Sequence, residues 1–173
     1  MKDENMQADV SPQDIKRGGH PHELLLINLI LNHVLIFIAT MGLAGSYPLL
    51  PLVVPFISIS IVSFIFYRAR VARTRDTMFV SAHWQICAQR SRIFLFMLAG
   101  ACLLLLLGWL GYAYLGMAKV TVLALFAVAI LPVMATILVL VVLESDAMNH
   151  ARKGTLPEWA LQRYGASARK ISN

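Results

Sequence analysis

The sequence predicts an all-α integral membrane protein in which four transmembrane helices form two antiparallel hairpins and pack as an up-down bundle. Four apolar runs each approach the ~20 residues that a helix needs to span hydrocarbon. None of them contains Asp, Glu, Lys or Arg, and short turns follow the first and the third. The runs cover residues 24–43, 49–67, 93–115 and 120–143, within a transmembrane domain of residues 23–144.

The first 22 residues are polar and show no apolar period. Pro12, Gly18, Gly19 and Pro21 interrupt them, and these residue types favour turns and loops. We therefore expect a flexible cytoplasmic tail over residues 1–22.

Two short connections join the apolar runs in pairs. Gly45, Ser46 and Pro48 predict a tight external turn after the first run, and residues 116–119 predict another after the third. Because such short connections force neighbouring helices to be antiparallel, two hairpins result. The basic cytoplasmic segment 68–92 joins these hairpins.

This joining segment contains a predicted short interfacial helix. Phe79, Val80, His83, Trp84 and Cys87 recur at offsets of four and eight, which places them on one helical face. We expect this face to lie at the membrane interface, where it either covers the base of the bundle or docks a partner.

A cytoplasmic tail over residues 145–173 contains a second predicted amphipathic helix, at about 156–164. Thr155 and Glu158 have the spacing of a capping box. Trp159 would anchor this helix among lipid headgroups or contact a partner.

The 15 Lys and Arg residues predict the orientation. Three precede the first run, six lie between the second and third, and five follow the fourth, whereas Lys119 alone lies in an external turn. Because Lys and Arg of short loops stay in the cytoplasm, both termini are predicted to be cytoplasmic. Helical spans with this charge asymmetry indicate the bacterial inner membrane. The basic residues are expected to contact anionic lipid headgroups and not nucleic acid.

Polar side chains inside the apolar runs are the first candidates for function, since each needs a partner where water is scarce. Asn28, Asn32 and His33 lie in the first run and Ser58 in the second. We expect them to hydrogen-bond across helices and hold the bundle together. The residues expected to pack helices or contact partners are Asn28, Asn32, Ser58, Gly100, Gly108, Trp84 and Trp159.

His33 carries the cofactor alternatives. His33, Ser58, Cys102 and Met134 each lie nine residues from the cytoplasmic end of their run, about 13 Å at the helical rise. This shared depth permits His33 to donate to Ser58, or His33, Cys102 and Met134 to bind a soft metal such as Cu(I). Haem at His33 would need a second ligand, such as Met134 or a residue of another chain. The sequence favours packing without a cofactor and leaves haem or copper as alternatives.

One charged residue flanks each run on the cytoplasmic side. These are Glu23, Arg68, Arg92 and Glu144, two acidic and two basic. Our hypothesis is an ion-paired ring that fixes the order of the helices, although exposed pairs contribute only about 0–1 kcal/mol each.

No residue constellation in the sequence indicates a reaction. A Ser–His–Asp pattern, metal-ligand spacing, a phosphate loop and paired carboxylates are all lacking, so enzymatic activity is not expected of this chain alone. The leading hypothesis is a non-catalytic membrane subunit, scaffold or assembly factor, whose partners are other membrane subunits or further copies of the chain. The alternatives are a small self-associating channel or transporter, and a redox anchor that binds haem or copper at His33.

Overall fold

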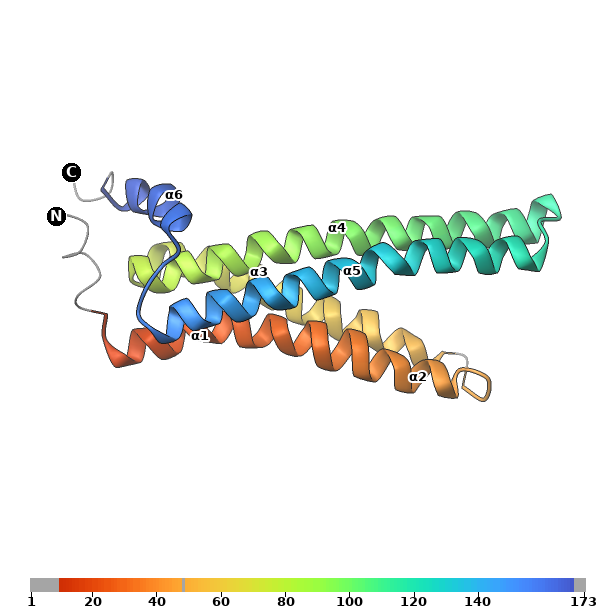
Figure 1. Ribbon diagram of the computed structural model, residues 1–173, viewed down its shortest axis with the longest axis horizontal. Coiled ribbons are helices and arrows are strands. Elements are labelled where there is room, and N and C mark those ends of the chain that lie inside the picture. Colours follow the sequence, from red (N-terminus) through yellow and green to blue (C-terminus); the bar gives the residue numbers. More distant parts are fainter. Residues whose placement is uncertain (1–9, 48, 170–173) are drawn as a thin grey trace. The chain divides into compact units, whose positions relative to one another are not determined.

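The computed structural model describes residues 10–47 and 49–169, with the backbone alone for residues 165–169. Every regular element of these residues is helical (Figure 1). The elements are α1 (Pro12–Leu26), the π-helical η2 (Ile27–Ile36), α2 (Phe37–Leu43), the 3₁₀ turn η3 (Leu50–Leu52), α3 (Val53–Arg75), α4 (Met78–Leu115), α5 (Lys119–Arg152) and α6 (Glu158–Arg169).

Four continuous helical stretches are long and apolar enough to cross a membrane. They are Pro12–Leu43, Leu50–Arg75, Met78–Leu115 and Lys119–Arg152. This confirms the all-α class and the four candidate spans, and it fits a multi-pass membrane protein. The pairing into hairpins and the bundle topology stay predictions.

The chain forms two compact units. The first contains the residues up to Gln89 together with those from Val141 onward, and the second is Arg90–Leu140. The boundaries fall inside α4 and α5, so each of these helices contributes to both units.

The structure corrects the expectation of a loose tail, because residues 12–22 are helical. The Ser11 hydroxyl caps α1 by accepting the Asp14 N–H at 3.1 Å. Pro12 occupies the first turn, where its missing N–H costs little. Sequence pattern alone concealed this helix, because its apolar partners lie in distant parts of the chain. Residues 1–9 lie outside the described residues.

Gly18 shows why glycine occurs in α1. A Cβ built there would lie 2.7 Å from Cε1 of Phe79 and 3.3 Å from Cδ2 of His83. Because no side chain intervenes, α1 approaches α4 closely. A glycine that resembled a helix breaker is therefore a packing residue.

The first apolar run continues α1 through η2 and α2. In η2 the backbone bonds reach five residues back, as in the bond from the Phe37 N–H to the Asn32 carbonyl. α2 ends in a turn in which the Ser46 and Tyr47 N–H groups bond to the Leu43 carbonyl. This matches the predicted position of a turn, although Pro48 lies outside the described residues.

The expected interfacial helix is not a separate element. It is the beginning of α4, which has 38 residues and is therefore about 57 Å long, well beyond the ~30 Å of a hydrocarbon core. The predicted interfacial face is also corrected. Phe79, Val80, His83, Trp84 and Cys87 are all buried within the protein, because other helices of the first unit cover them.

α5 ends at Arg152, and Gly154 follows with a φ of +68°, which suits glycine. The Thr155 N–H bonds to the His150 carbonyl, and the Gly154 N–H bonds to the Ala151 carbonyl, which is a Schellman motif. The expected capping box is absent at this place: the Thr155 hydroxyl donates back to the His150 carbonyl at 3.3 Å. α6 follows and extends to Arg169, beyond the predicted end at 164.

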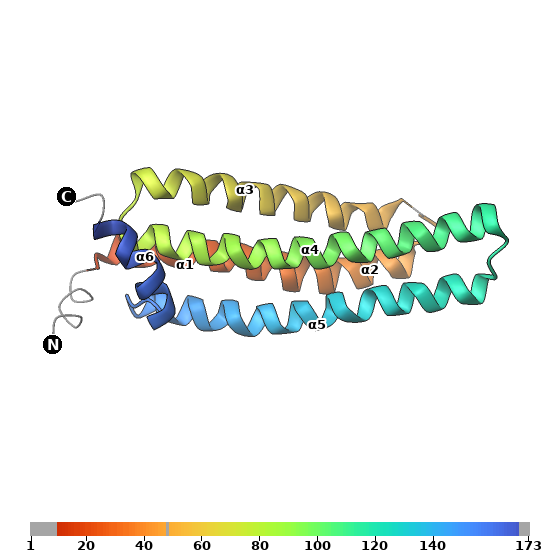
Figure 2. The ribbon, with the colours of Figure 1, turned by 90° about the horizontal axis from the view of Figure 1, so that it is seen from above.

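The second unit contains residues 90–115 of α4 and residues 119–140 of α5, which Figure 2 shows in green to cyan. Gly108 of α4 packs against the side chain of Leu125 on α5. Gly116, with φ +68°, forms the turn between the helices, and the Met117 N–H bonds to the Gly111 carbonyl at 3.1 Å. Most of the large apolar side chains in this unit are exposed, as expected of a surface in contact with lipid.

Candidate functional site

A row of three fully buried polar side chains lies in the first unit. Nδ1 of His22 lies 2.5 Å from Oε2 of Glu144, and Nε2 of His22 lies 2.9 Å from Nδ1 of His83. α1 supplies His22, α4 supplies His83 and α5 supplies Glu144. All three side chains are 0% exposed, so the row connects three helices in the interior.

The chemistry of the row follows from its donors and acceptors. An ionised carboxylate only accepts hydrogen bonds, so Glu144 in this form requires the hydrogen on Nδ1 of His22. In neutral His22 the other ring nitrogen, Nε2, then accepts from Nδ1–H of His83. Each contact between neighbours in the row thus contains one hydrogen, and both ring nitrogens of His22 are used.

Aromatic rings and a thiol form the surroundings of the row. The Phe79 ring packs edge-on against His83, with centroids 4.7 Å apart. The Cys87 thiol donates to the Pro21 carbonyl at 3.2 Å. The bond from Cys87 ties α4 to α1 at the residue before His22.

Trp84 packs beside the row in a cage of other side chains. Its ring lies edge-on to His20 at 6.3 Å and to Phe64 at 6.2 Å between centroids. The Arg68 guanidinium lies 5.5 Å from the Trp84 ring centroid, within the range of a cation–π contact. Trp84 is therefore a core residue that links α1, α3 and α4, and it is not available as an exposed docking residue.

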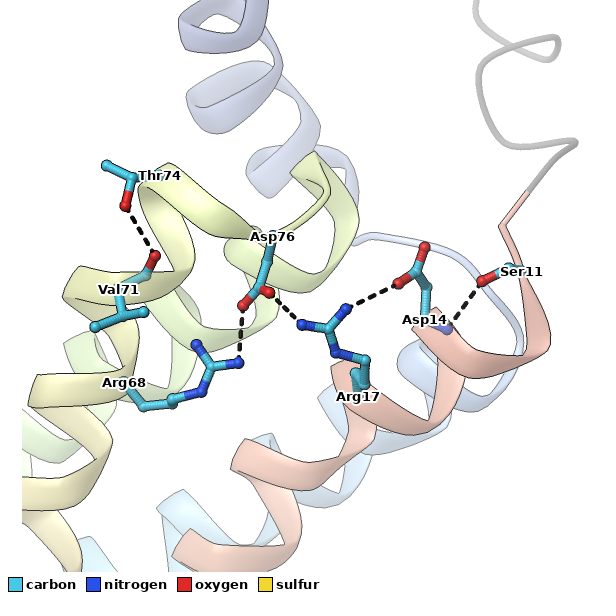
Figure 3. A network of polar contacts seen from close by, with 7 residues as sticks. All are labelled: Ser11, Asp14, Arg17, Arg68, Val71, Thr74 and Asp76. Carbon is cyan, nitrogen blue, oxygen red and sulfur yellow. Dashed lines mark hydrogen bonds and ion pairs between the residues drawn. The ribbon is translucent and has the colours of Figure 1, made fainter.

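An ion-pair network secures the same end of the unit. Asp76 lies in the loop between α3 and α4, and its side chain is 2% exposed. Figure 3 shows Arg17 and Arg68 reaching it from two elements. Arg17 pairs with Oδ1, while Nη2 of Arg68 lies 3.0 Å from Oδ2 as an ion pair without the geometry of a directional hydrogen bond. Asp14 adds a weaker contact to Arg17 at 3.7 Å.

Three residues of the predicted ring of flanking charges have contacts outside the ring. Glu144 bonds to His22, and Arg68 pairs with Asp76. Glu23 is exposed and lies 3.9 Å from His20 on its own helix. The helices extend past the apolar runs and bring other polar residues to this level, and the pairing of Glu144 with Arg92 within the ring stays a prediction.

The predicted packing residues of the first two runs do come together. Nδ2 of Asn28 donates to the Ser58 hydroxyl at 3.1 Å. Nδ2 of Asn32 donates to Oδ1 of Asn28 at 3.1 Å and to the Val54 carbonyl at 2.9 Å. These hydrogen bonds connect η2 to α3 within the apolar stretch.

The expected bond from His33 to Ser58 is not present. Nδ1 of His33 lies 3.0 Å from the Asn28 carbonyl, five residues back in η2, and Asn28 contacts Ser58 in its place. The wide turns of η2 rotate His33 away from the orientation that an α-helix would give it.

The three predicted copper ligands belong to different units. His33 lies in the first, and Cys102 and Met134 lie in the second. Cys102 is exposed, whereas a metal ligand in a closed site is enclosed by its neighbours. Among the described residues, no group of three or more His, Cys, Asp or Glu side chains is arranged to hold a metal ion. The haem and copper hypotheses gain no support from these positions.

Of the predicted packing positions Gly100, Gly108 and Trp159, only Gly108 packs closely against another helix. Gly108 packs against Leu125, whereas a Cβ on Gly100 would meet nothing within 4 Å. Trp159 on α6 is 43% exposed, so it is open to lipid or to a partner.

Sequence reasoning missed the row itself. His22 was assigned to the tail, and Glu144 to an exposed ring. One signal was present in the sequence: Gly18, His22, Leu25 and Leu29 follow offsets of four, seven and eleven, the spacing of one helical face.

The comparisons with known proteins supply no relative. The chain matches no protein-family model, no curated protein and no solved structure at a significant level.

Proposed function

We propose that this chain is a non-catalytic multi-pass protein of the bacterial cytoplasmic membrane that serves as a subunit, scaffold or assembly factor of a larger membrane complex. In this proposal its helices form two antiparallel hairpins in an up-down bundle. Both termini, and with them the charged helix ends, lie in the cytoplasm.

The exposed face of α6 is the observation that carries the proposal. Leu156, just before α6, and Ala160 are buried and attach it to the first unit, while Trp159 is 43% exposed. Glu158 and Gln162, beside Trp159, are exposed too. A partly exposed tryptophan among polar neighbours is the usual anchor of a protein interface.

The core beneath α6 supports the same proposal. Between Phe79 and Ala88 every residue except Ser81 is buried, and the Glu144–His22–His83 row and the Asp76 network tie α1, α3, α4 and α5 together. A rigid base of this kind presents α6 with little loss of conformational entropy on binding.

Purification in mild detergent tests the proposal. Wild type and Gln162→Ala, the control on the same face, should each copurify with a partner in a fixed ratio, and Trp159→Ala should lose most of it. Recovery of the wild type alone, fully folded, would contradict the proposal. A partner retained equally by Trp159→Ala would exclude α6 as the docking element.

Orientation is tested by cysteine labelling in a Cys102→Ser background, since Cys87 is buried. A membrane-impermeant maleimide added to intact cells should label Ser46→Cys and leave Arg75→Cys unlabelled until the cells are opened. Labelling of Arg75→Cys in intact cells would reverse the proposed orientation.

A self-associating channel or transporter is the second candidate. The hydrogen-bonded group of Asn28, Asn32 and Ser58 inside the apolar stretch favours it, because neutral polar groups can line a pathway. Ion or solute flux across liposomes that contain only this chain would support the second candidate, and the absence of flux under all gradients would reject it.

A further inference from the structure

Two of the four arginines near the end of α3 are engaged within the protein. Arg68 pairs with Asp76, and Figure 3 shows its guanidinium reaching that carboxylate. Nη2 of Arg73 donates to Oε1 of Gln85 on α4 at 2.7 Å. Both guanidinium groups therefore tie the end of α3 to neighbouring parts of the first unit.

The other two arginines, Arg70 and Arg75, are exposed. Among the described residues, neither pairs with a carboxylate or has another polar partner. Because an α-helix has 3.6 residues per turn, these two side chains point in directions about 140° apart around the axis. Their charges lie on different sides of α3, and each is open to an anion from outside the chain.

Tyr67 lies one turn before Arg70 and on the same side of α3. Side chains three residues apart in a helix are neighbours. Tyr67 is 64% exposed and is the last residue of the apolar run 49–67. Its hydroxyl and the Arg70 guanidinium are both hydrogen-bond donors. Two donors and one positive charge thus adjoin at the point where the apolar run ends.

The same side of α3 continues into the apolar run. Phe56, Ser60, Ser63 and Tyr67 follow offsets of four, seven and eleven, the spacing of one helical face, and all four are exposed. The Ser60 hydroxyl donates to the Phe56 carbonyl at 2.9 Å, so its donor is already used. Two small residues between two large rings form a strip about 16 Å long at the helical rise. A hydrocarbon chain can lie along this strip.

We propose that Arg70 and Tyr67 form a binding site for one anionic phospholipid, with an acyl chain of this lipid along Phe56, Ser60 and Ser63. The guanidinium and the phenol hydroxyl donate hydrogen bonds to the phosphate of the headgroup. This inference goes beyond the function as a membrane subunit. It requires only that the candidate span Leu50–Arg75 crosses the bilayer.

The charges at this end of α3 favour an anionic headgroup. Arg17 and Arg68 share the Asp76 carboxylate, so the nearby network has a positive surplus and does not compensate Arg70. Anionic lipids attract basic residues that lie next to a span, and the planar guanidinium matches the geometry of a phosphate. A zwitterionic lipid has the same phosphate, but its own ammonium group cancels the charge. The site should therefore select lipids by net charge.

The arrangement differs from a general attraction between basic residues and the membrane. A general attraction depends on the number of positive charges and treats Arg70 and Arg75 alike. The proposed site depends on position, because Tyr67 and the apolar strip lie beside Arg70 and on a different side of the helix from Arg75. The two arginines therefore form a matched pair of equal charge.

Native mass spectrometry of the whole protein in a neutral detergent tests the site. Wild type titrated with phosphatidylglycerol should retain one lipid more tightly than in a titration with phosphatidylcholine. Arg70→Gln should weaken the binding of phosphatidylglycerol about tenfold or more, the effect of losing one hydrogen bond to a charged group. Arg75→Gln removes the same charge and should change the affinity less than about twofold, since distant exposed charges are screened. Tyr67→Phe should give a smaller loss than Arg70→Gln.

Three results would overturn the proposal. Equal weakening by Arg70→Gln and Arg75→Gln would show an attraction that depends on net charge alone. Phosphatidylglycerol binding that is unchanged in Arg70→Gln would exclude this side of α3. Equal affinity of wild type for the two lipids would remove the selection for an anionic headgroup. Because both arginines are exposed, both variants should keep the wild-type unfolding midpoint in circular dichroism, which separates lost binding from lost folding.

Discussion

Replacing Gly18 with alanine should weaken the packing of α1 on α4, whereas the same change at Gly19 should not. The two glycines are adjacent in one helix, and both are buried. A Cβ at position 18 would lie 2.7 Å from Cε1 of Phe79, but a Cβ at position 19 would meet nothing within 4 Å. The pair therefore separates a steric effect from the general effect of adding a methyl group to a helix.

The expected magnitude follows from this geometry. Ordinary contact begins near 3.4 Å, so the Phe79 ring must retreat by the difference between 3.4 and 2.7 Å, about 0.7 Å. Because Phe79 and His83 are both buried, the rings have no open space to enter, and overpacking of this kind costs about 1–3 kcal/mol. Both variants gain about 1 kcal/mol of helix propensity. The difference in unfolding free energy between them should therefore be about 1–3 kcal/mol, with Gly19→Ala the more stable.

Unfolding of both variants and wild type in the same detergent, followed by circular dichroism, measures this difference. Gly19→Ala should unfold at or above the wild-type midpoint, and Gly18→Ala below Gly19→Ala. Equal midpoints for the two variants would refute the close approach of α1 to α4, and with it the placement of His22 beside His83.

Three further predictions concern the caps and polar networks. Gly154→Ala should lower the unfolding free energy by about 1 kcal/mol or more, because alanine is strained at a φ of +68°, and Gly154→Asn should recover part of this loss in the same unfolding assay. Asp76→Asn should cost about 1–3 kcal/mol, since two arginines lose their charged partner, and raised salt should narrow the gap to wild type. A double-mutant cycle of Asn28→Leu and Ser58→Ala should give a coupling free energy of about 0.6 kcal/mol, and a value near zero would remove the hydrogen bond between η2 and α3 from the description.

The sequence predicted the four spans because crossing hydrocarbon is a property of consecutive residues. The apolar run 120–143, for example, lies entirely within α5. The same criterion placed the cytoplasmic end of each helix at the first charged residue. The ends were misplaced because a helix continues past the bilayer wherever other helices cover it, and residues 12–22 and 78–92 are both of this kind.

The candidate site depended on contacts that no local pattern contains. His22 meets His83 across 61 positions of the chain and Glu144 across 122. A histidine next to polar residues in a terminal segment has the appearance of a solvated residue unless its partners are known. Helical spacing from Gly18 to Leu29 was the only local clue, and Pro21 within the same stretch argued against a helix.

Inside the spans, the kind of interaction was easier to predict than the pairing. Asn28, Asn32 and Ser58 form the hydrogen bonds expected of polar groups in an apolar region. Ser58 was matched with His33 because the two share a depth, yet depth leaves the direction of a side chain open. The π-helical backbone of η2 sets the direction of the His33 side chain. Counting residues along an ideal α-helix does not predict that direction.

The cage around Trp84 gives this protein an optical probe of its own folding. Trp84 is 2% exposed, whereas Trp109 and Trp159 are 55% and 43% exposed. Changing the two exposed tryptophans to phenylalanine would leave Trp84 as the single tryptophan. The wavelength of its fluorescence maximum would then report how far water enters the core beside His20 and Arg68. Loosening of α1 would then be visible as a red shift in real time, without any attached dye.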